Sequence, residues 1–169
     1  MNMTGGARVR AATLADCAAL AAMRLRLQEQ LERESPALWR MTETRRTALP
    51  RFYAECIVDP DVCVLAAEVE SEPEAGIIGT AIGRVETGRD VQRYGSIEDV
   101  WLEPQHRGQG MCSSLMAELA AFFERRGVSE LTLGFVPGGS AASVWQHFGF
   151  RPAVVIANAS VEALKRHVL

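Results

Sequence analysis

Three β-rich runs follow one another in the middle of the chain, with helical stretches on both sides. The runs cover residues 62–69, 77–85 and 96–102, and each is rich in Val, Ile or Leu. Apolar residues at three- and four-residue spacing predict helices before residue 60 and after residue 110. This order predicts one α/β domain with a mixed sheet, and 169 residues are enough to give such a domain its own hydrophobic core.

The first helix has a start signal, a buried face and a stop signal. A short strand over residues 8–11 precedes Thr13 and Asp16, which have the spacing of a capping box. Ser35-Pro36 ends the helix. The positions predicted to form its buried face are Leu20, Met23, Leu27 and Leu31.

Turn residues and apolar spacing predict the other elements. In chain order, we expect a helix from Thr42 to about residue 58 with a break at Leu49-Pro50, a hairpin link at residues 71–76, a polar link at 86–93, a helix from 111 to 126, a strand at 130–135, a helix at 141–148, a strand at 151–157 and a short helix after Ser160.

Composition excludes several classes of protein. The 18 Lys and Arg against 21 Asp and Glu give a net charge of −3, which argues against a nucleic-acid binder that neutralises phosphates. The longest apolar runs, such as residues 62–67 and 153–157, are far shorter than the roughly 20 residues of a membrane span. Residues 1–6 have no basic region followed by an apolar one, so we expect no signal peptide and a cytoplasmic location.

The cysteines and histidines do not have metal-site spacing. Four cysteines and three histidines are scattered along the chain, without a C-x-x-C pair. We therefore expect free thiols and no metal.

The segment over residues 97–112 predicts an anion site. A strand runs through a loop that contains Gly108 and Gly110 into a helix, whose first N–H groups lack intrahelical partners and lie at the positive end of the dipole. Glycines let the backbone approach a pyrophosphate, and Arg107 adds a charged donor. No lysine follows as in a Walker A motif, and Ser113 stands where the dinucleotide fingerprint needs a third glycine. A plain glycine turn that starts a helix is the alternative.

This segment resembles the acyl-CoA loop of the GNAT superfamily of acyl-CoA-dependent N-acyltransferases. The residues that carry the resemblance are Gln105-x-x-Gly108-x-Gly110 after Val100-x-Leu102-x-Pro104, Val9-Arg10-Ala11-Ala12-Thr13-x-x-Asp16, Ile77-Ile-Gly79 with Ala81, and Ala141-x-x-x-Trp145-Gln-His-Phe-Gly149-Phe150. They span residues 8–157 in the family's order, and we expect residues 158–169 to form a C-terminal helical tail.

The resemblance implies a single GNAT-like domain with a mixed, mostly antiparallel central sheet, splayed to hold acyl-CoA and flanked by helices. It implies that acetyl-CoA is the co-substrate, that backbone groups around Val100, Trp101 and Leu102 bind its pantetheine arm, and that a homodimer is allowed. The loop residues implied to hold the pyrophosphate are Arg107, Gly108, Gln109, Gly110, Met111 and Cys112.

Glu98 and Asp99 are the candidate bases. An amine acceptor is protonated near neutral pH, and a carboxylate can take that proton directly or through a water. Neighbouring side chains on a strand point to opposite faces, so only one of the two is expected to face the acceptor unless a bulge intervenes. We favour Glu98, which shares parity with Val100 and Leu102. Solvated surface carboxylates are the alternative.

The chain departs from the family pattern at several positions. Trp145 stands where the family often has a tyrosine that protonates the leaving thiolate, and residues 137–140 replace a frequent asparagine. Indole N–H does not ionise in the working range, so we predict that Trp145 packs against the acyl-CoA arm or the core. Cys112 stands where a small residue is frequent, and we expect it to pack rather than react. Trp39-Arg40 lies where the family builds its acceptor wall, although ordinary surface packing is the favoured interpretation of both residues.

The leading hypothesis is an N-acetyltransferase that moves an acetyl group from acetyl-CoA to a primary amine of a small molecule, by direct attack in a ternary complex. One alternative is a protein or peptide N-acetyltransferase. The other is a non-catalytic module that binds acyl-CoA for regulation, because binding needs only the loop whereas chemistry needs a base.

Overall fold

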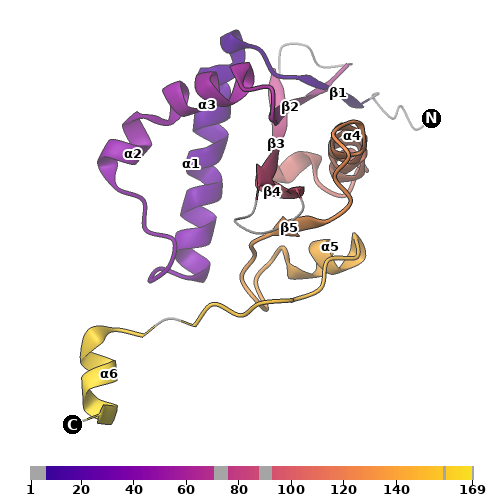
Figure 1. Cartoon of the computed structure of the whole chain (residues 1–169). Coiled ribbons are helices and arrows are strands. Elements are labelled where there is room, and N and C mark those ends of the chain that lie inside the picture. The colour runs from indigo at the N-terminus through magenta and orange to yellow at the C-terminus, as the bar shows by residue number, and fades with distance from the viewer. Residues whose placement is uncertain (1–6, 71–75, 88–92, 158, 169) are drawn as a thin grey trace. The chain divides into compact units, whose positions relative to one another are not determined.

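The computed structural model describes residues 7–70, 76–87, 93–157 and 159–168 (Figure 1). Two links expected from the sequence, at residues 71–76 and 86–93, lie largely outside these residues. Internal contacts divide the chain into two compact units, which we describe separately. The first unit contains Met1–Glu29 and Met41–Gly134, and the second contains Gln30–Arg40 and Phe135–Leu169.

The first unit is built on a five-stranded mixed sheet, as the sequence predicts. Its strands lie in the order β1-β2-β3-β4-β5. The first three neighbouring pairs are antiparallel, and β5 is parallel to β4. Strands β2 and β3 form the expected hairpin, whereas β5 is shorter than predicted. The strands are β1 (Ala7–Ala11), β2 (Val62–Val69), β3 (Ile77–Thr87), β4 (Arg93–Leu102) and β5 (Leu131–Leu133).

The helices of this unit begin and end near their sequence signals. The first helix, α1, ends at Glu34, directly before Ser35-Pro36. The second helical stretch is broken at Ala48, because Pro50 starts a new helix more readily than it continues one. These elements are the 3-10 turn η1 (Leu14–Asp16), α1 (Cys17–Glu34), α2 (Glu43–Thr47), α3 (Leu49–Val58), the 3-10 turn η3 (Pro104–His106) and α4 (Met111–Arg125).

The two faces of the sheet are covered by different helices. Ile82 is fully buried in a cluster with Leu20 of α1 and Tyr53 of α3. The next residue, Gly83, points to the other face, where the side chains of Leu119 and Phe123 of α4 lie against it. Helices α1 and α3 therefore cover one face and α4 covers the other (Figure 1).

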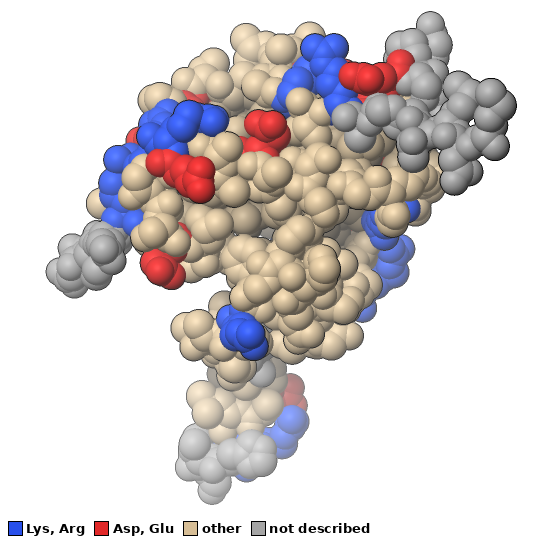
Figure 2. Space-filling view, turned by 90° about the vertical axis from the view of Figure 1, so that its right-hand side faces the viewer, with Lys and Arg blue, Asp and Glu red and all other residues tan. Residues whose placement is uncertain are grey.

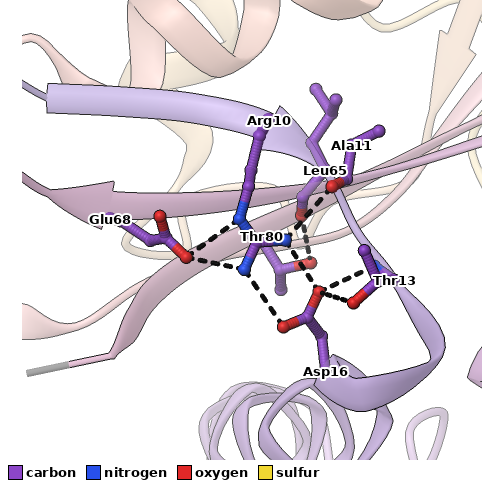
Figure 3. A network of polar contacts seen from close by, with 7 residues as sticks. All are labelled: Arg10, Ala11, Thr13, Asp16, Leu65, Glu68 and Thr80. Carbon is purple, nitrogen blue, oxygen red and sulfur yellow. Dashed lines mark hydrogen bonds and ion pairs between the residues drawn. The ribbon is translucent and has the colours of Figure 1, made fainter. Parts of the chain in front are cut away.

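Arg10 joins β1, β2 and the start of α1 (Figure 3). Its guanidinium donates to Glu68 Oε1 at 2.6 and 2.9 Å and to Asp16 Oδ2 at 2.8 Å. Asp16 Oδ2 also accepts the backbone N–H of Thr13 at 2.7 Å and its hydroxyl at 3.0 Å, which confirms the capping box. One carboxylate thus caps a helix and holds two strands through the same arginine.

The pKa of Asp16 predicts how this contact responds to acid. The hydrogen bond from Arg10 lowers the pKa of the Asp16 carboxyl from 3.8 to about 2. Its stabilisation is therefore complete above the unfolded-state pKa and is lost as the pH falls through the folded-state pKa. We expect Asp16→Asn to lower the free energy of unfolding by about 1–3 kcal/mol at pH 7. Urea denaturation from pH 7 to pH 2 should show that difference shrinking below about pH 4, and a difference independent of pH would contradict this account.

The second unit ties the end of α1 to the loop over residues 137–140. Ser140 Oγ donates to Glu34 Oε1 at 2.6 Å, and Gln30 Nε2 donates to Ser140 Oγ at 2.6 Å. The hydrogen bond from Ser140 lowers the pKa of Glu34. Gly139 is needed there, because a Cβ would lie 2.6 Å from Glu34 Oε2 and 3.0 Å from the carbonyl oxygen of Val136.

The prediction of a strand over residues 151–157 is wrong. These residues have no regular structure, and α5 (Ala142–His147) and α6 (Val161–Val168) are the other elements of the second unit. Val154, Val155 and Ile156 are 82%, 81% and 75% exposed. Three consecutive β-branched residues favour a strand only where a neighbouring strand supplies hydrogen bonds and packing, and no strand pairs with them among the described residues. The helix after Ser160 is confirmed, with Ala163 N–H donating to Ser160 Oγ at 3.0 Å.

Side chains of both charges are exposed on the surface (Figure 2). On the face drawn in Figure 2, acidic and basic side chains lie in small groups near one another, with broad uncharged areas between them. Among the described residues, no helix combines the length and the apolar character that crossing a bilayer requires.

The close packing of α4 on β4 predicts a stability difference between two glycines. A Cβ on Gly95 would lie 2.5 Å from Phe123 Cε1 and 2.6 Å from Leu131 Cδ2, whereas one on Gly134 meets no atom within 4 Å. Gly95→Ala should therefore lower the free energy of unfolding by about 1–3 kcal/mol. Gly134→Ala, the matched control, should stay within about 0.5 kcal/mol of the parent in the same urea titration. An equal change in the free energy of unfolding in the two variants would show that the sheet and α4 can move apart without a loss of stability.

Candidate functional site

Strand β4 extends beyond its partner β5. Strand β3 pairs with β4 as far as Leu102, but the parallel pairing with β5 stops at Ile97. Over residues 98–102, the edge of β4 on the β5 side therefore has no paired strand among the described strands. Backbone N–H and C=O groups on such an edge can bind an extended ligand as an added strand. The pairing thus ends where the sequence resemblance implies that the sheet is splayed to hold acyl-CoA.

The chain leaves β4 through η3 and two left-handed glycines into α4. Gly108 and Gly110 have φ of 75° and 82°, a region that favours glycine, as expected for this loop. The N–H of Ser114 donates to the carbonyl oxygen of Gly110 at 3.1 Å. The amides of Met111, Cys112 and Ser113 precede this bond and have no intrahelical acceptor. The start of α4 thus presents backbone donors at the positive end of its dipole, which favours an anion.

Arg107 is held at the end of β4. Its Nε donates to the carbonyl oxygen of Leu102 at 3.0 Å, and its guanidinium lies 4.8 Å from the ring centroid of buried Trp101. Gln109 folds back and donates to the carbonyl oxygen of Gln105 at 3.2 Å. The structure therefore brings the predicted charged donor beside both the end of the strand and the glycine loop.

Cys112 is half-buried, and Met111 beside it is buried. Burial raises the pKa of the Cys112 thiol, so the helix N-terminus does not produce a thiolate there. This supports packing over reactivity at position 112.

A β-bulge interrupts β4 at the candidate bases. Ile82 of β3 pairs with Glu98 and Thr80 pairs with Trp101, so Ala81 alone faces two residues of β4, Asp99 and Val100. Asp99 has φ of 50° and is the only non-glycine residue with positive φ in the described part of the chain. The left-handed conformation costs an L residue about 1–2 kcal/mol, and Asp tolerates it better than most.

Both carboxylates lie on the α3 side of the sheet, Glu98 through its pairing with Ile82 and Asp99 through the bulge. Asp99 Oδ2 accepts the hydroxyl of Tyr53 at 3.2 Å. Glu98 Oε1 lies 3.7 Å from Arg84 Nε, and Arg84 Nη2 donates to Cys56 Sγ at 3.4 Å. Tyr53 and Cys56 are buried one turn apart on α3, so both acids face that helix. Alternation along a regular strand predicted opposite faces, and the extra residue of the bulge removes that alternation.

The two carboxylates differ in environment. Asp99 Oδ1 forms an ion pair with Arg24 Nε of α1 at 2.7 Å, and the Asp99 side chain is 15% exposed. Burial raises the pKa of Asp99, and the charge of Arg24 opposes that rise. Burial also raises the pKa of Tyr53, which stays protonated as a donor. Glu98 is 37% exposed and accepts the hydroxyl of Ser96 at 3.0 Å, so Glu98 is the carboxylate that solvent reaches.

Arg24 and Tyr53 are not predicted from the sequence pattern. Arg24 is four residues after Leu20, so it lies on the apolar face of α1, where an unpaired arginine would be costly. The position of Arg24 on this apolar face was the sequence signal from which a buried ion pair could have been predicted. Its partner could not be found in the same way, because Asp99 is far away in the sequence.

Trp145 belongs to the second unit and packs among aromatic rings. It is 8% exposed, and its ring centroid lies 6.0 Å from that of Phe150 and 6.4 Å from that of Phe148. Trp39 is half-buried and Arg40 is exposed, and both also belong to the second unit. Among the described residues, no group of three or more Asp, Glu, His or Cys is arranged to hold a metal ion.

A family model described as the acetyltransferase (GNAT) family matches residues 24–150, which is more than half of the chain. The chain belongs to this acetyltransferase family. A search of curated protein sequences gave no match.

Solved GNAT structures share the fold at low sequence identity. A predicted acetyltransferase with acetyl-CoA from Clostridium acetobutylicum has 20% identity and a TM-score of 0.71, over 93% of this chain and 97% of that chain. Glucosamine-6-phosphate N-acetyltransferase from Arabidopsis thaliana has 16% identity and a TM-score of 0.63, over 92% and 99%. Ribosomal-protein-alanine N-acetyltransferase from Brucella melitensis has 17% identity and a TM-score of 0.64, over 92% and 99%.

The aromatic packing of Trp145 predicts a mild effect of Trp145→Phe. Only part of the ring area and one N–H are lost, so kcat should stay within roughly tenfold of the parent. Steady-state kinetics with a separate measurement of acetyl-CoA affinity test this expectation. A thousandfold loss of kcat at unchanged acetyl-CoA affinity would instead give the indole a direct part in the reaction.

Proposed function

We propose that this GNAT protein transfers an acetyl group from acetyl-CoA to a primary amine of a small-molecule acceptor, by direct attack in a ternary complex. The observation that carries the proposal is the unpaired edge of β4 over residues 98–102, which leads into the two-glycine loop and the start of α4. An extended arm followed by a pyrophosphate is the ligand chemistry that this arrangement suits.

The acyl-CoA side uses mainly backbone groups. The pantetheine arm pairs with the backbone of Val100, Trp101 and Leu102, and the amides from Gly108 to Cys112 hold the pyrophosphate. No side-chain atom lies within 4 Å of a Cβ built on Gly110, so a phosphate can come close to the backbone there. Arg107, at the end of β4, adds positive charge beside this loop.

Glu98 serves as the base on the acceptor side. The protonated amine gives one proton to the Glu98 carboxylate, directly or through a water, and its nitrogen lone pair then attacks the thioester carbonyl. The tetrahedral intermediate collapses, the C–S bond breaks and CoA leaves as a thiolate, while the new amide nitrogen gives up its second proton to water. Trp145 cannot supply a proton to that thiolate at working pH. The pKa of a thiol is about 8.5, so the thiolate is a tolerable leaving group that water protonates.

Gly110→Ala tests the loop. The change forces a side chain into the left-handed conformation and places a methyl group where the pyrophosphate must approach, so acetyl-CoA affinity should fall at least tenfold. Gly127→Ala is the matched control, because Gly127 has φ of 67°, has equally open surroundings and lies at the other end of α4. Calorimetric titration should show a loss of acetyl-CoA affinity in Gly110→Ala alone. Urea denaturation should show a similar loss of stability in both variants. Equal affinities would remove the pyrophosphate from this loop.

Glu98→Gln tests the chemistry. The amide keeps the shape but takes no proton, so kcat should fall about 10²-fold while acetyl-CoA affinity hardly changes. The assay is release of free CoA thiol over a panel of small amines and peptides. Turnover with peptides alone would favour protein acetylation, and acetyl-CoA binding without turnover on any amine would favour a regulatory binding module.

A further inference from the structure

The strongest feature that the acetyl-transfer chemistry does not use is the polar cluster around Asp99. Arg24 comes from α1, Tyr53 from α3 and Asp99 from the bulge of β4, and all three lie in the first unit. Tyr53 is fully buried, and the side chains of Arg24 and Asp99 are 13% and 15% exposed. Three elements that are separate in the sequence therefore meet through one carboxylate.

Both oxygens of Asp99 are engaged. Arg24 Nε binds Oδ1 at 2.7 Å, and the hydroxyl of Tyr53 donates to Oδ2 at 3.2 Å. Arg24 is itself fixed, because its Nη1 donates to Gln28 Oε1 at 2.9 Å one turn further along α1. A carboxylate held in this way is less available for a proton from the acceptor than Glu98, which is 37% exposed.

Asp99 also carries the strain of the bulge. An L residue at φ of 50° persists only where its surroundings hold it there, and the contacts on this side chain are those of Arg24 and Tyr53. Glu98 pairs with Ile82 directly before the bulge and faces the same side of the sheet as Ile82, the side that α1 and α3 cover. Holding Asp99 therefore fixes the backbone beside Glu98, and with it the direction of the Glu98 side chain.

We propose that Arg24, Tyr53 and Asp99 are positioning residues, which lock the β4 bulge so that Glu98 faces the acceptor amine. This inference rests on the proposed acetyl transfer. Arg24 and Tyr53 touch neither reacting atom, and they act through Asp99 and the backbone of β4.

Kinetics of single variants test the proposal. Arg24→Met should lower kcat about 10- to 100-fold because Glu98 is misplaced, with KM for acetyl-CoA changed less than threefold. Arg24→Lys keeps the charge beside Asp99 and should recover most of that loss. Tyr53→Phe, which removes only the hydroxyl, should lower kcat about three- to tenfold. Arg10→Met removes a comparable ion pair on β1 and β2, and it should lower stability while leaving kcat unchanged.

A comparison of Asp99→Asn with Glu98→Gln separates a positioning residue from a base. Asn can still accept from Arg24 and tolerates the left-handed conformation, so Asp99→Asn should keep kcat within about tenfold. The midpoints of the pH–rate profile should be the same in Arg24→Met as in the parent, because the arginine does not contact the base. If Asp99→Asn loses 10²-fold or more while Glu98→Gln stays active, Asp99 is the base. That result overturns this inference but leaves the proposed acetyl transfer intact.

Hydrogen exchange tests whether Arg24 holds the β4 bulge, even if no amine is acetylated. Amide exchange over residues 97–102 should speed up at least tenfold in Arg24→Met and stay at the parent rate in Arg10→Met. Unchanged exchange at β4 in Arg24→Met would overturn the inference, whatever the acceptor proves to be.

Discussion

The ion pair between Arg24 and Asp99 is the contact on which the proposed acceptor side of the site depends. A regular β4 would point Glu98 and Asp99 to opposite faces, one under α3 and one under α4. Glu98 pairs with Ile82 on the α3 face, and the bulge brings Asp99 to that face as well. The left-handed conformation that the bulge needs is costly for any residue with a side chain. The charge-assisted hydrogen bond between Arg24 and Asp99, which is half-buried, offsets the free-energy cost of that conformation.

Sequence patterns predicted the sheet and the glycine loop because both depend on local rules. Strand runs, the capping box at Thr13 and Asp16, and the break before Pro50 each follow from residues only a few positions apart. The left-handed glycines of the loop are equally local, since φ of 75° and 82° at Gly108 and Gly110 requires those residue types wherever the loop lies. The family resemblance then gave these elements their order in space.

The errors and omissions lie where distant residues decide the outcome. Val154, Val155 and Ile156 have strand propensity, but a strand also needs a neighbour, and propensity cannot report whether one is there. The bulge at Asp99 could be allowed for but not located, because it depends on the registers of Ile82 and Thr80 on another strand. Arg24 and Tyr53 were missed for the same reason, since only the folded chain brings them to Asp99.

The candidate site presents backbone groups on the α4 face of the sheet and charged side chains on the α1 and α3 face. The packing of the helices explains this difference. On the α4 face, Gly83 and Gly95 let Leu119 and Phe123 lie directly against the strands, which fixes the helix close to the sheet. A helix fixed in this way aims its first amides with little freedom, so the proposed acyl-CoA side can work mainly with backbone donors. On the other face, α1 and α3 contribute side chains that hold a carboxylate pair. Under the proposed function, substitutions on α1 and α3 would therefore change the acceptor, while β4, the glycine loop and α4 would still bind the same acyl donor.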